Sequence, residues 1–352
     1  MKKIFLLFLS LVPLMSLAQR AVELKQQNLS KWKIGTANYS GITPLGDHRY
    51  AVVSDKEPTD GFYVFRIEQD SLEGKIEQVA LEGFYGNPSP RLDESGMSVR
   101  DGEGIAYFPV NHTVFIAGEG DQSILEYNMD GTLTGRQLQV PKMFSLENTV
   151  PNMGFESLSY SPEQHLFWTM TESTLLQDGT VAGPAHPETQ NLLRLQSFND
   201  HLQPVAQYAY RMDRGKSEDF GKIYVLGVSE VTALPDGKVL VLEREADIPK
   251  GNLSAEVVCK LFLVDPLHSW QIQDDIDLRT LDPNKFLVKT LVATFTTKYT
   301  PFLHNFANYE GMCLGRKLAD GRNTLLMISD SQAGFGKGPF RLNDYIKVLI
   351  LP

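Results

Sequence analysis

The stretch Gly102-Glu-Gly-Ile-Ala-Tyr-Phe-Pro109, followed by Thr113-Val-Phe-Ile-Ala-Gly-Glu119, predicts the fold because its pattern recurs along the chain. It contains a short apolar run, a turn at Asn111-His112 and a second apolar run that ends in a carboxylate. Turn residues between two apolar runs indicate a β-hairpin. Four further copies begin at Tyr39, Phe155, Val228 and Tyr309. The chain is therefore expected to repeat one structural unit five times.

Two more strand-like runs follow most copies, as Gly61–Ile67 and Ile76–Leu81 follow the first copy. Four strands per repeat are typical of a β-propeller blade, so we predict an all-β propeller of five four-stranded blades, with six blades as the alternative. The last copy supplies one further strand, Tyr345–Leu351. We expect Lys31–Ile34, near the other end of the chain, to complete this blade. Pairing the two ends of the chain would remove open sheet edges.

The net charge of −10, from 33 Lys and Arg against 43 Asp and Glu in 352 residues, argues against nucleic acid and anionic membranes as partners. Residues 1–18 have the layout of a signal peptide: two lysines, an apolar run, and small residues at Ser16 and Ala18. We therefore expect a secreted or periplasmic protein with one domain over residues 19–352. No later apolar run reaches the ~20 residues that span a bilayer.

The rarer residue types exclude several familiar sites. Cys259 and Cys313 are too few for a disulfide-rich scaffold or a cysteine-based zinc cluster; they form one bridge or lie apart as buried thiols. The seven histidines show no zinc-hydrolase spacing. A Gly-x-Ser-x-Gly motif is absent from the sequence, which disfavours a serine esterase.

Carboxylates recur at two positions of the repeat. The position before the first strand holds Ser40, Glu103, Glu156, Ser229 and Glu310, with Glu230 one residue further along in the fourth copy. The second strand ends at Asp55, Glu119, Glu172, Glu243 and Asp330. The first strand of each blade lines the central channel and the second is antiparallel to it, so both positions should meet at one mouth.

Like charges so close together need compensation, and a hard divalent cation supplies it. Ca²⁺ accepts six to eight oxygens in irregular geometry, so it is the expected ion. The expected metal ligands are Asp55, Glu103, Glu119, Glu156, Glu172, Glu230, Glu243, Glu310 and Asp330. The alternative is that these acids cap turns and accept backbone N–H bonds within each blade.

At these residues the sequence resembles the phytase-like family of exported bacterial proteins, described as having an esterase-like activity of phytase. The resemblance covers roughly residues 36–351. The motifs that show it are Gly102–Ala106, Phe155–Leu158, Glu230–Pro235, Glu310–Met312 and Ser329–Ser331. The resemblance implies a propeller with acid-rich repeats and a phosphate-ester hydrolase role. The chain lacks the Asp-Ala-x-Asp-Asp-Pro-Ala run of the calcium-dependent propeller phytases.

The leading functional hypothesis is Ca²⁺-dependent hydrolysis of a phosphate monoester or diester by a monomer acting on small molecules. Glu103 or Glu156 would take a proton from the attacking water, and Arg244 and His304 are the further catalytic candidates. Lys56 and Arg100 are other cations that could reach the mouth. Two alternatives stay open: a non-catalytic propeller that binds a ligand or protein around a structural Ca²⁺, and a lactonase-like esterase.

Overall fold

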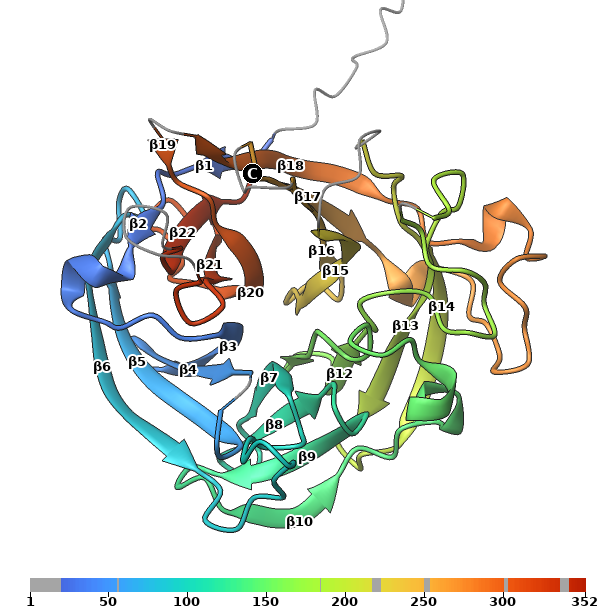
Figure 1. Ribbon diagram of the computed structural model, residues 1–352, viewed down its shortest axis with the longest axis horizontal. Helices are drawn as coiled ribbons and strands as arrows, with labels where there is room; N and C mark the ends of the chain where they lie inside the picture. Colours follow the sequence, from blue (N-terminus) through green and yellow to red (C-terminus); the bar gives the residue numbers. More distant parts are fainter. Residues whose placement is uncertain are drawn as a thin grey trace, which may run out of the picture.

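The computed structural model describes residues 20–55, 57–183, 185–216, 223–249, 254–300, 303–335 and 342–352. The expected signal peptide and Lys56 lie outside these ranges, as does the side chain of His304. Five antiparallel sheets surround a central axis, so the predicted five-bladed β-propeller is confirmed (Figure 1). The first strand of each sheet lies innermost, next to the axis (Figure 1).

Each blade is built from strands that follow one another in the sequence. Blade 1 comprises β3 (Tyr39–Gly46), β4 (Arg49–Ser54), β5 (Gly61–Gln69) and β6 (Ile76–Gly86). Blade 2 comprises β7 (Gly102–Phe108), β8 (Thr113–Gly118), β9 (Ser123–Asn128) and β10 (Leu133–Gln137). Blade 3 comprises β11 (Ser159–Ser161), β12 (Leu166–Thr169), β13 (Leu192–Asn199) and β14 (Pro204–Arg211).

The last two blades depart slightly from this plan. Blade 4 comprises β15 (Ile223–Ala233), β16 (Val239–Ile248), β17 (Glu256–Val264), β18 (Thr290–Thr300) and the short β19 (Leu303–His304). Blade 5 comprises β20 (Asn308–Leu314), β21 (Thr324–Asp330) and β22 (Tyr345–Ile350), with β1 (Val22–Glu23) and β2 (Gln27–Asn28) both paired to β22. The helices described are short 3-10 turns: η1 (Leu29–Trp32), η2 (Lys142–Phe144), η3 (Leu146–Asn148), η4 (Pro266–His268) and η5 (Pro283–Lys285).

The N-terminal end of the described chain closes the propeller, although not with the residues expected. Val22 pairs with Ile350, and Gln27 pairs with Ile346. The prediction that Lys31–Ile34 forms the closing strand is wrong, because this stretch begins inside η1. The Asn28 side chain accepts a hydrogen bond from the Ser30 N–H, and Lys33 takes a left-handed conformation. Both features start and end a helical turn rather than continue a strand.

The hydrophobic core lies between the blades. Five clusters of buried side chains fill the five junctions between neighbouring blades. Phe62, Phe115 and Trp168 pack in three of them. Cys259 and Cys313 belong to different clusters and form no bridge, so the possibility of a disulfide is ruled out.

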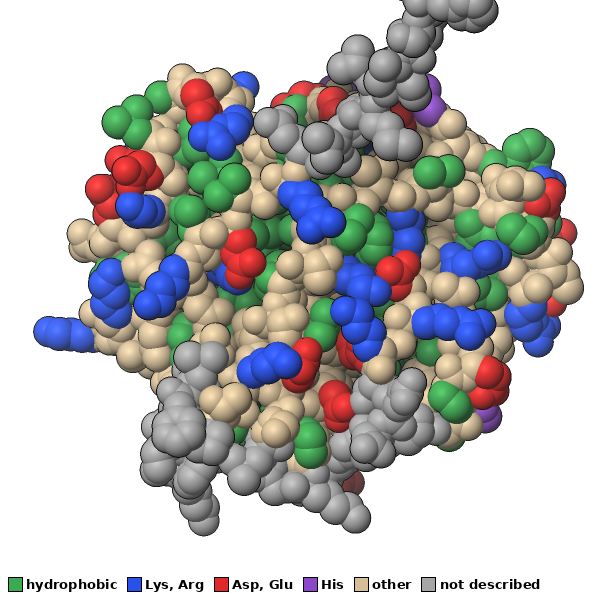
Figure 2. Space-filling view, turned by 90° about the horizontal axis from the view of Figure 1, so that it is seen from above, with side chains coloured by type: hydrophobic (Ala, Val, Ile, Leu, Met, Phe, Trp, Pro, Cys, Tyr) green, Lys and Arg blue, Asp and Glu red, His purple; other side chains and the backbone are tan. Residues whose placement is uncertain are grey.

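The outer surface differs from the axis in its charge pattern. The side of the propeller in Figure 2 shows Lys and Arg side chains interspersed with Asp and Glu. The carboxylates near the axis, by contrast, are buried. Within the residues that the structure describes, no helix has the length and apolar character needed to cross a membrane.

Candidate functional site

A break in strand pairing aims side chains at the axis in four of the five blades. The ladder between the first two strands shifts register between Gly102 and Ile105 in blade 2, and between Tyr309 and Gly311 in blade 5. Blade 1 shifts between Tyr39 and Ile42, and blade 4 shifts at Ser229. A bulge re-aims the side chain at the break, and bulges occur often beside functional sites.

In blade 3 the regular pairing of the first two strands is also interrupted, but without a bulge. Phe155 forms an isolated bridge with Thr171, and regular pairing in β11 resumes only at Ser159. Glu156 lies in the gap between them. The repeat position of Glu103, Glu156 and Glu310 is therefore irregular in all five blades. The sequence placed this position before the first strand, but in every blade except blade 3 it lies inside that strand, at the break in pairing.

The glycine after this position lets the innermost strands approach closely. A Cβ on Gly104 would lie 2.5 Å from the Leu158 nitrogen in blade 3. A Cβ on Gly311 would lie 2.4 Å from the Ser40 carbonyl oxygen in blade 1. Real Cβ atoms do not come so near to backbone, so only glycine permits this packing. The tight packing holds the first strands against one another around the acidic residues.

Asp55, Asp101 and Glu103 form the first group of carboxylates. One carboxylate oxygen from each lies within 4.8 Å of the others. Asp101 was not among the predicted ligands. Its φ of 48° is left-handed, and its carbonyl oxygen accepts a 2.8 Å hydrogen bond from the Glu119 N–H. The buried Asp101 Oδ1 has no hydrogen-bond partner among the described atoms.

Glu119, Glu156 and Glu172 form the second group. Their oxygens also lie within 4.8 Å of one another, and all three side chains are buried. Glu119 Oε1 accepts a 2.8 Å hydrogen bond from the Gly154 N–H, which orients it. Six acidic residues from blades 1, 2 and 3 thus converge in two triplets. We call these six residues, with Glu310 and Asp330, the acidic mouth.

Arg244 is the cation in contact with the acidic mouth among the described residues. Its Nη2 lies 2.5 Å from Glu172 Oε1, and its Nη1 pairs with Glu310 Oε1. Asn308 Oδ1 accepts a further 3.0 Å hydrogen bond from Nη1. Arg244 is 5% exposed, and its Nε has no partner among the described atoms. One guanidinium thus links the carboxylates of blades 3 and 5.

The protonation of the acidic mouth reflects burial first and mutual repulsion second. Burial, together with Glu156, Asp55, Glu310 and Glu119, raises the pKa of Glu103 well above its ordinary value. Burial and the neighbouring Glu172 likewise raise the pKa of Glu156, although Arg244 opposes the shift. Because these groups act on one another, the two triplets form one electrostatic unit.

Asp330 completes the acidic mouth from blade 5. Burial, then Glu310 and Asp55, raises the pKa of Asp330 well above its ordinary value. Its Oδ1 accepts a 2.6 Å hydrogen bond from the Gln332 N–H. Glu310 accepts a 3.5 Å hydrogen bond from Ser40, the residue at its own repeat position in blade 1. Both acids therefore lie at the place that the repeat predicts.

Glu230 and Glu243 lie apart from the two triplets. Glu230 is buried at 1% exposure and accepts hydrogen bonds from the Leu158 N–H at 3.1 Å and the Val231 N–H at 2.9 Å. Its side chain therefore links blades 3 and 4. Burial raises the pKa of Glu230 well above its ordinary value, although these backbone N–H groups oppose the shift.

The Glu243 carboxylate contacts blade 3 rather than the axis. It lies 2.7 Å from Lys289 Nζ and accepts a 2.6 Å hydrogen bond from the Tyr210 hydroxyl. The repeat placed Glu243 at a strand end, but β16 runs on to Ile248. Successive residues of a strand face opposite sides, so Arg244 rather than Glu243 contacts the acidic mouth.

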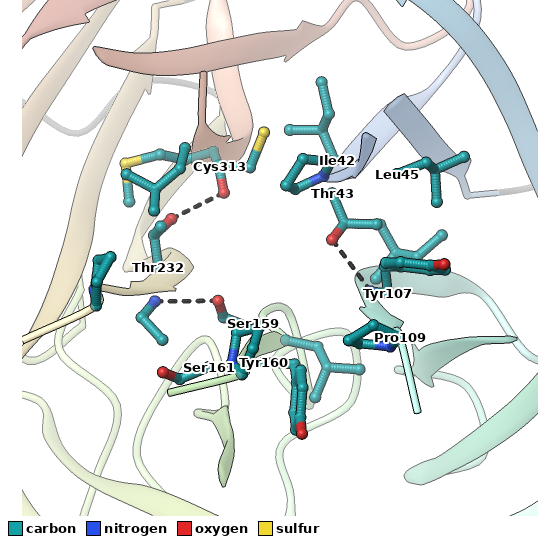
Figure 3. Close-up of a pocket in the computed structure, with 18 of the residues that line it drawn as sticks. Ile42, Thr43, Leu45, Tyr107, Pro109, Ser159, Tyr160, Ser161, Thr232 and Cys313 are labelled. Atoms are coloured by element: carbon teal, nitrogen blue, oxygen red, sulfur yellow. Dashed lines mark hydrogen bonds between the residues drawn. The ribbon is translucent and has the colours of Figure 1, made fainter. Parts of the chain in front are cut away.

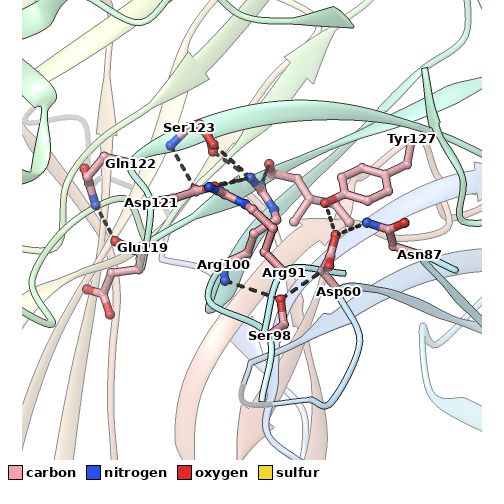
Figure 4. A network of polar contacts seen from close by, with 11 residues as sticks. Asp60, Asn87, Arg91, Ser98, Arg100, Glu119, Asp121, Gln122, Ser123 and Tyr127 are labelled. Atoms are coloured by element: carbon pink, nitrogen blue, oxygen red, sulfur yellow. Dashed lines mark hydrogen bonds and ion pairs between the residues drawn. The ribbon is translucent and has the colours of Figure 1, made fainter. Parts of the chain in front are cut away.

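Arg100 is bound within its own blade. Its Nη1 lies 2.9 Å from Asp121 Oδ2 and donates a 2.8 Å hydrogen bond to Ser123 Oγ. Figure 4 shows this network turned away from the Glu119 carboxylate. Of the two suggested cations whose side chains the structure describes, Arg100 and Arg244, Arg244 is the one that contacts the acidic mouth.

The opposite mouth of the channel has a different character. A cavity of about 400 Å³ is lined by the far ends of the first strands of all five blades, and by their turns (Figure 3). Its hydroxyl groups bond between blades: the Tyr107 N–H donates to Thr43 Oγ1 at 3.1 Å, and Thr232 Oγ1 donates to the Met312 carbonyl at 2.9 Å. We call this cavity the apolar mouth.

The acidic mouth suits a hard divalent cation. Its donors are all carboxylate oxygens, which Ca²⁺ and Mg²⁺ prefer, and two triplets each offer three of them within 4.8 Å. The orphaned, buried Asp101 Oδ1 is an atom that a cation would satisfy. Asp55, Asp101 and Glu103 are therefore the residues that best fit a metal ion, followed by Glu119, Glu156 and Glu172.

Comparison with known proteins gives a family. Residues 34–332 match the phytase-like family, described as having an esterase-like activity of phytase, and the chain belongs to that family. No curated protein matches the sequence.

Several solved structures are similar to the chain at low sequence identity. An endo-arabinase from Bacteroides thetaiotaomicron is 12% identical over 92% of this chain and 96% of its own, with a TM-score of 0.47. The PQQ-bound aldose sugar dehydrogenase from Streptomyces coelicolor is 12% identical over 93% of this chain and 98% of its own, with a TM-score of 0.39. Similarities this distant carry no functional argument.

Proposed function

We propose that this phytase-like propeller is an exported, metal-dependent hydrolase of phosphate esters, with Ca²⁺ bound at the acidic mouth. The observation that carries the proposal is the convergence of two buried carboxylate triplets at the axis, with one guanidinium as the cation in contact with them in the described chain. Such a cluster is costly without a cation, because like charges in a buried site repel one another. Membership of the phytase-like family supports an ester as the substrate.

The metal would be held by Asp55, Asp101 and Glu103, with Glu119, Glu156 and Glu172 available to a second ion. When bound, a divalent cation supplies Lewis-acid stabilisation of charge on a phosphoryl group. The chain's own residues then orient the substrate and move the proton.

Glu156 is the best placed residue to hold and release a proton. It lies in the second triplet, and burial together with Glu172 raises its pKa well above the ordinary value, which favours a carboxyl group that holds a proton. Arg244 is fixed between Glu172 and Glu310, so its charge stays beside that proton carrier without a change of conformation. A fixed cation stabilises developing negative charge on a phosphoryl group better than a mobile one.

The test is hydrolysis of a panel by protein comprising residues 19–352, with Ca²⁺ or with EDTA. The panel holds a phosphate monoester, a phosphate diester, phytate, a carboxylic ester and a lactone. We expect turnover of a phosphate ester that is lost with EDTA and with Glu156→Gln, and retained with Glu126→Gln. Glu126 is a matched control, because it is buried at 0% exposure in blade 2 and bonds to Thr113 away from the two triplets.

Turnover of the lactone or carboxylic ester alone would replace the phosphate-ester proposal with an esterase. A second candidate function rests on the burial of the same residues, because Glu103 and Glu172 are only 5% and 2% exposed. A non-catalytic propeller with a structural cation would also enclose its ligands. It predicts no turnover of any panel member, together with a melting temperature that Ca²⁺ raises.

A further inference from the structure

The inner strands of blade 4 continue past the acidic mouth. β15 and β16 have 11 and 10 residues, whereas β7 and β8 of blade 2 have 7 and 6. Their pairing runs on from Gly227↔Arg244 to Ile223↔Ile248. Since Arg244 contacts Glu172 and Glu310, the strand pairs beyond it form a wall on one side of the mouth.

The segment from Asp213 to Lys216 is fastened to this wall by its backbone. The Asp213 N–H donates to Glu243 Oε2 at 3.1 Å. The Lys216 N–H donates to both oxygens of Glu245, at 2.8 and 3.0 Å. The Asp213 carboxylate is held in turn by Lys260 and Lys289, each at 2.8 Å. Both ends of this short segment are therefore fixed in place.

Arg214 lies between these two anchors and is exposed. It makes no hydrogen bond or ion pair with any other residue in the described ranges. It lines a small surface hollow whose other charged residues are Asp213, Glu243, Arg244, Glu245 and Lys260. A segment anchored at Asp213 and Lys216 thus presents one guanidinium, unpaired among the described residues, in the same hollow as the arginine that contacts the acidic mouth.

The nearby carboxylates do not compete for this guanidinium. Glu243 is engaged by Lys289 and Tyr210, and both oxygens of Glu245 accept the Lys216 N–H. The planar guanidinium keeps its N–H donors for an anion from solvent, and its fork geometry matches phosphate and carboxylate. The opposite arrangement holds in the two triplets, which offer acceptors and no donors.

We propose that Arg214 binds the anionic phosphate of the substrate at the edge of the acidic mouth and so selects phosphate esters over neutral esters. This inference rests on the proposed function, because it assumes that a phosphate ester is the molecule that reaches the mouth. In this proposal Arg214 determines specificity. It neither carries the proton nor binds the metal.

The test compares Arg214→Met, Arg214→Lys and the control Arg322→Met. The control removes the same charge from an exposed arginine that pairs with Asp320 in the β20–β21 turn. Two readouts are taken with Ca²⁺ present: KM for p-nitrophenyl phosphate, and Kd for phenylphosphonate by calorimetry. Phenylphosphonate cannot be hydrolysed, so its Kd reports binding without turnover.

We expect Arg214→Met to raise both KM and Kd about 10-fold, the effect of losing a charge-assisted pair to phosphate. Arg214→Lys should recover part of the loss, because it keeps the charge without the fork. Arg322→Met should change neither value. Wild-type values in Arg214→Met would overturn the inference and leave the hydrolase proposal standing.

The two proposals fail in distinguishable ways. A wild-type protein that hydrolyses no phosphate ester but binds phenylphosphonate through Arg214 would refute the hydrolase and support the anion site. A wild-type protein that neither hydrolyses nor binds these phosphorus compounds would overturn both. Each variant's melting temperature, compared with wild type, separates lost binding from lost folding.

Discussion

The two mouths of the channel are built on the same five strands but use polar groups in opposite ways. On β7, Glu103 faces the acidic mouth, and Tyr107, four residues later, lines the apolar mouth. At the apolar mouth, hydroxyls bond to the backbone of a neighbouring blade, as Thr43 and Thr232 do. At the acidic mouth, Asp101 Oδ1 and Arg244 Nε stay buried without a described partner.

This difference separates polar groups that hold the blades together from groups that, under the proposed function, a ligand would satisfy. A hydroxyl that bonds between blades is satisfied without a ligand, so it adds stability alone. A buried, unsatisfied atom costs free energy and persists where function requires it. The comparison can be tested by substitutions of similar size at the two ends.

The largest effect should come from Glu156→Gln. Loss of the proton carrier should lower kcat for the phosphate ester about 1000-fold, within the range of general acid–base catalysis. Thr43→Val at the apolar mouth should leave kcat unchanged. Steady-state kinetics of both variants checks this pair, and equal losses at both ends would contradict the division between the mouths.

Arg244→Met should give the next largest effect. It leaves the Glu172 and Glu310 carboxylates buried without their cation, which costs about 3 kcal/mol or more of the free energy of unfolding. Urea unfolding in EDTA measures the change. Arg322→Met, on the surface of blade 5, should lie within about 0.5 kcal/mol of wild type. An unchanged free energy of unfolding in Arg244→Met would mean that the buried carboxylates of the acidic mouth do not need a positive charge beside them.

Removal of Ca²⁺ should have a smaller but clear effect. Saturation at 100 times Kd stabilises the folded state by about 2.7 kcal/mol, so Ca²⁺ should raise the melting temperature measured by calorimetry. Asp101→Asn should weaken this response, because it removes a ligand charge from the first triplet. An equal response in Asp101→Asn would exclude this residue from the metal site.

The pH dependence of stability should reveal Glu230. Its pKa is raised by burial, so the stability it contributes is full below the unfolded-state pKa and is lost as pH rises towards the folded-state pKa. Glu230→Gln should therefore melt higher than wild type at pH 8 in EDTA and equally at pH 4. A difference of the same size at both pH values would show that the effect is one of packing.

The smallest effect should come from Thr232→Val. It deletes one hydrogen bond to the Met312 carbonyl and should cost about 1 kcal/mol, without change in activity or Ca²⁺ response. Chemical unfolding and the esterase panel together check this expectation. Lost activity would show that the apolar mouth takes part in function.

The fold could be predicted because the repeat pairs local turn signals with apolar runs five times over. The sequence was a weaker guide to which residues of a strand face the axis and to where each strand ends. Glu243 aligned with Glu172 by position, yet β16 continues to Ile248, and alternation brings Arg244 to the mouth instead. The closing strand was misplaced because Asn28 begins a helical turn at the site where a strand was expected.

Asp101 shows a second limit of sequence reasoning. It precedes Glu103 by two residues, inside an Asp-Gly pair that usually signals only a turn. Its left-handed backbone, φ 48°, brings the carboxylate back beside Glu103 and Asp55. Nothing in local composition distinguishes such a turn from an ordinary one.

The closing pairs of blade 5 also govern how the chain can fold. Val22 pairs with Ile350, so residues more than three hundred positions apart in the sequence must meet before the ring closes. Contacts between such distant parts of a sequence form slowly, because the loop between them must close first. An incomplete chain that ends before β22 is an arc with two open sheet edges, and edges of that kind invite aggregation. The ring is therefore closed, and its edges are protected from aggregation, only once β22 has joined blade 5.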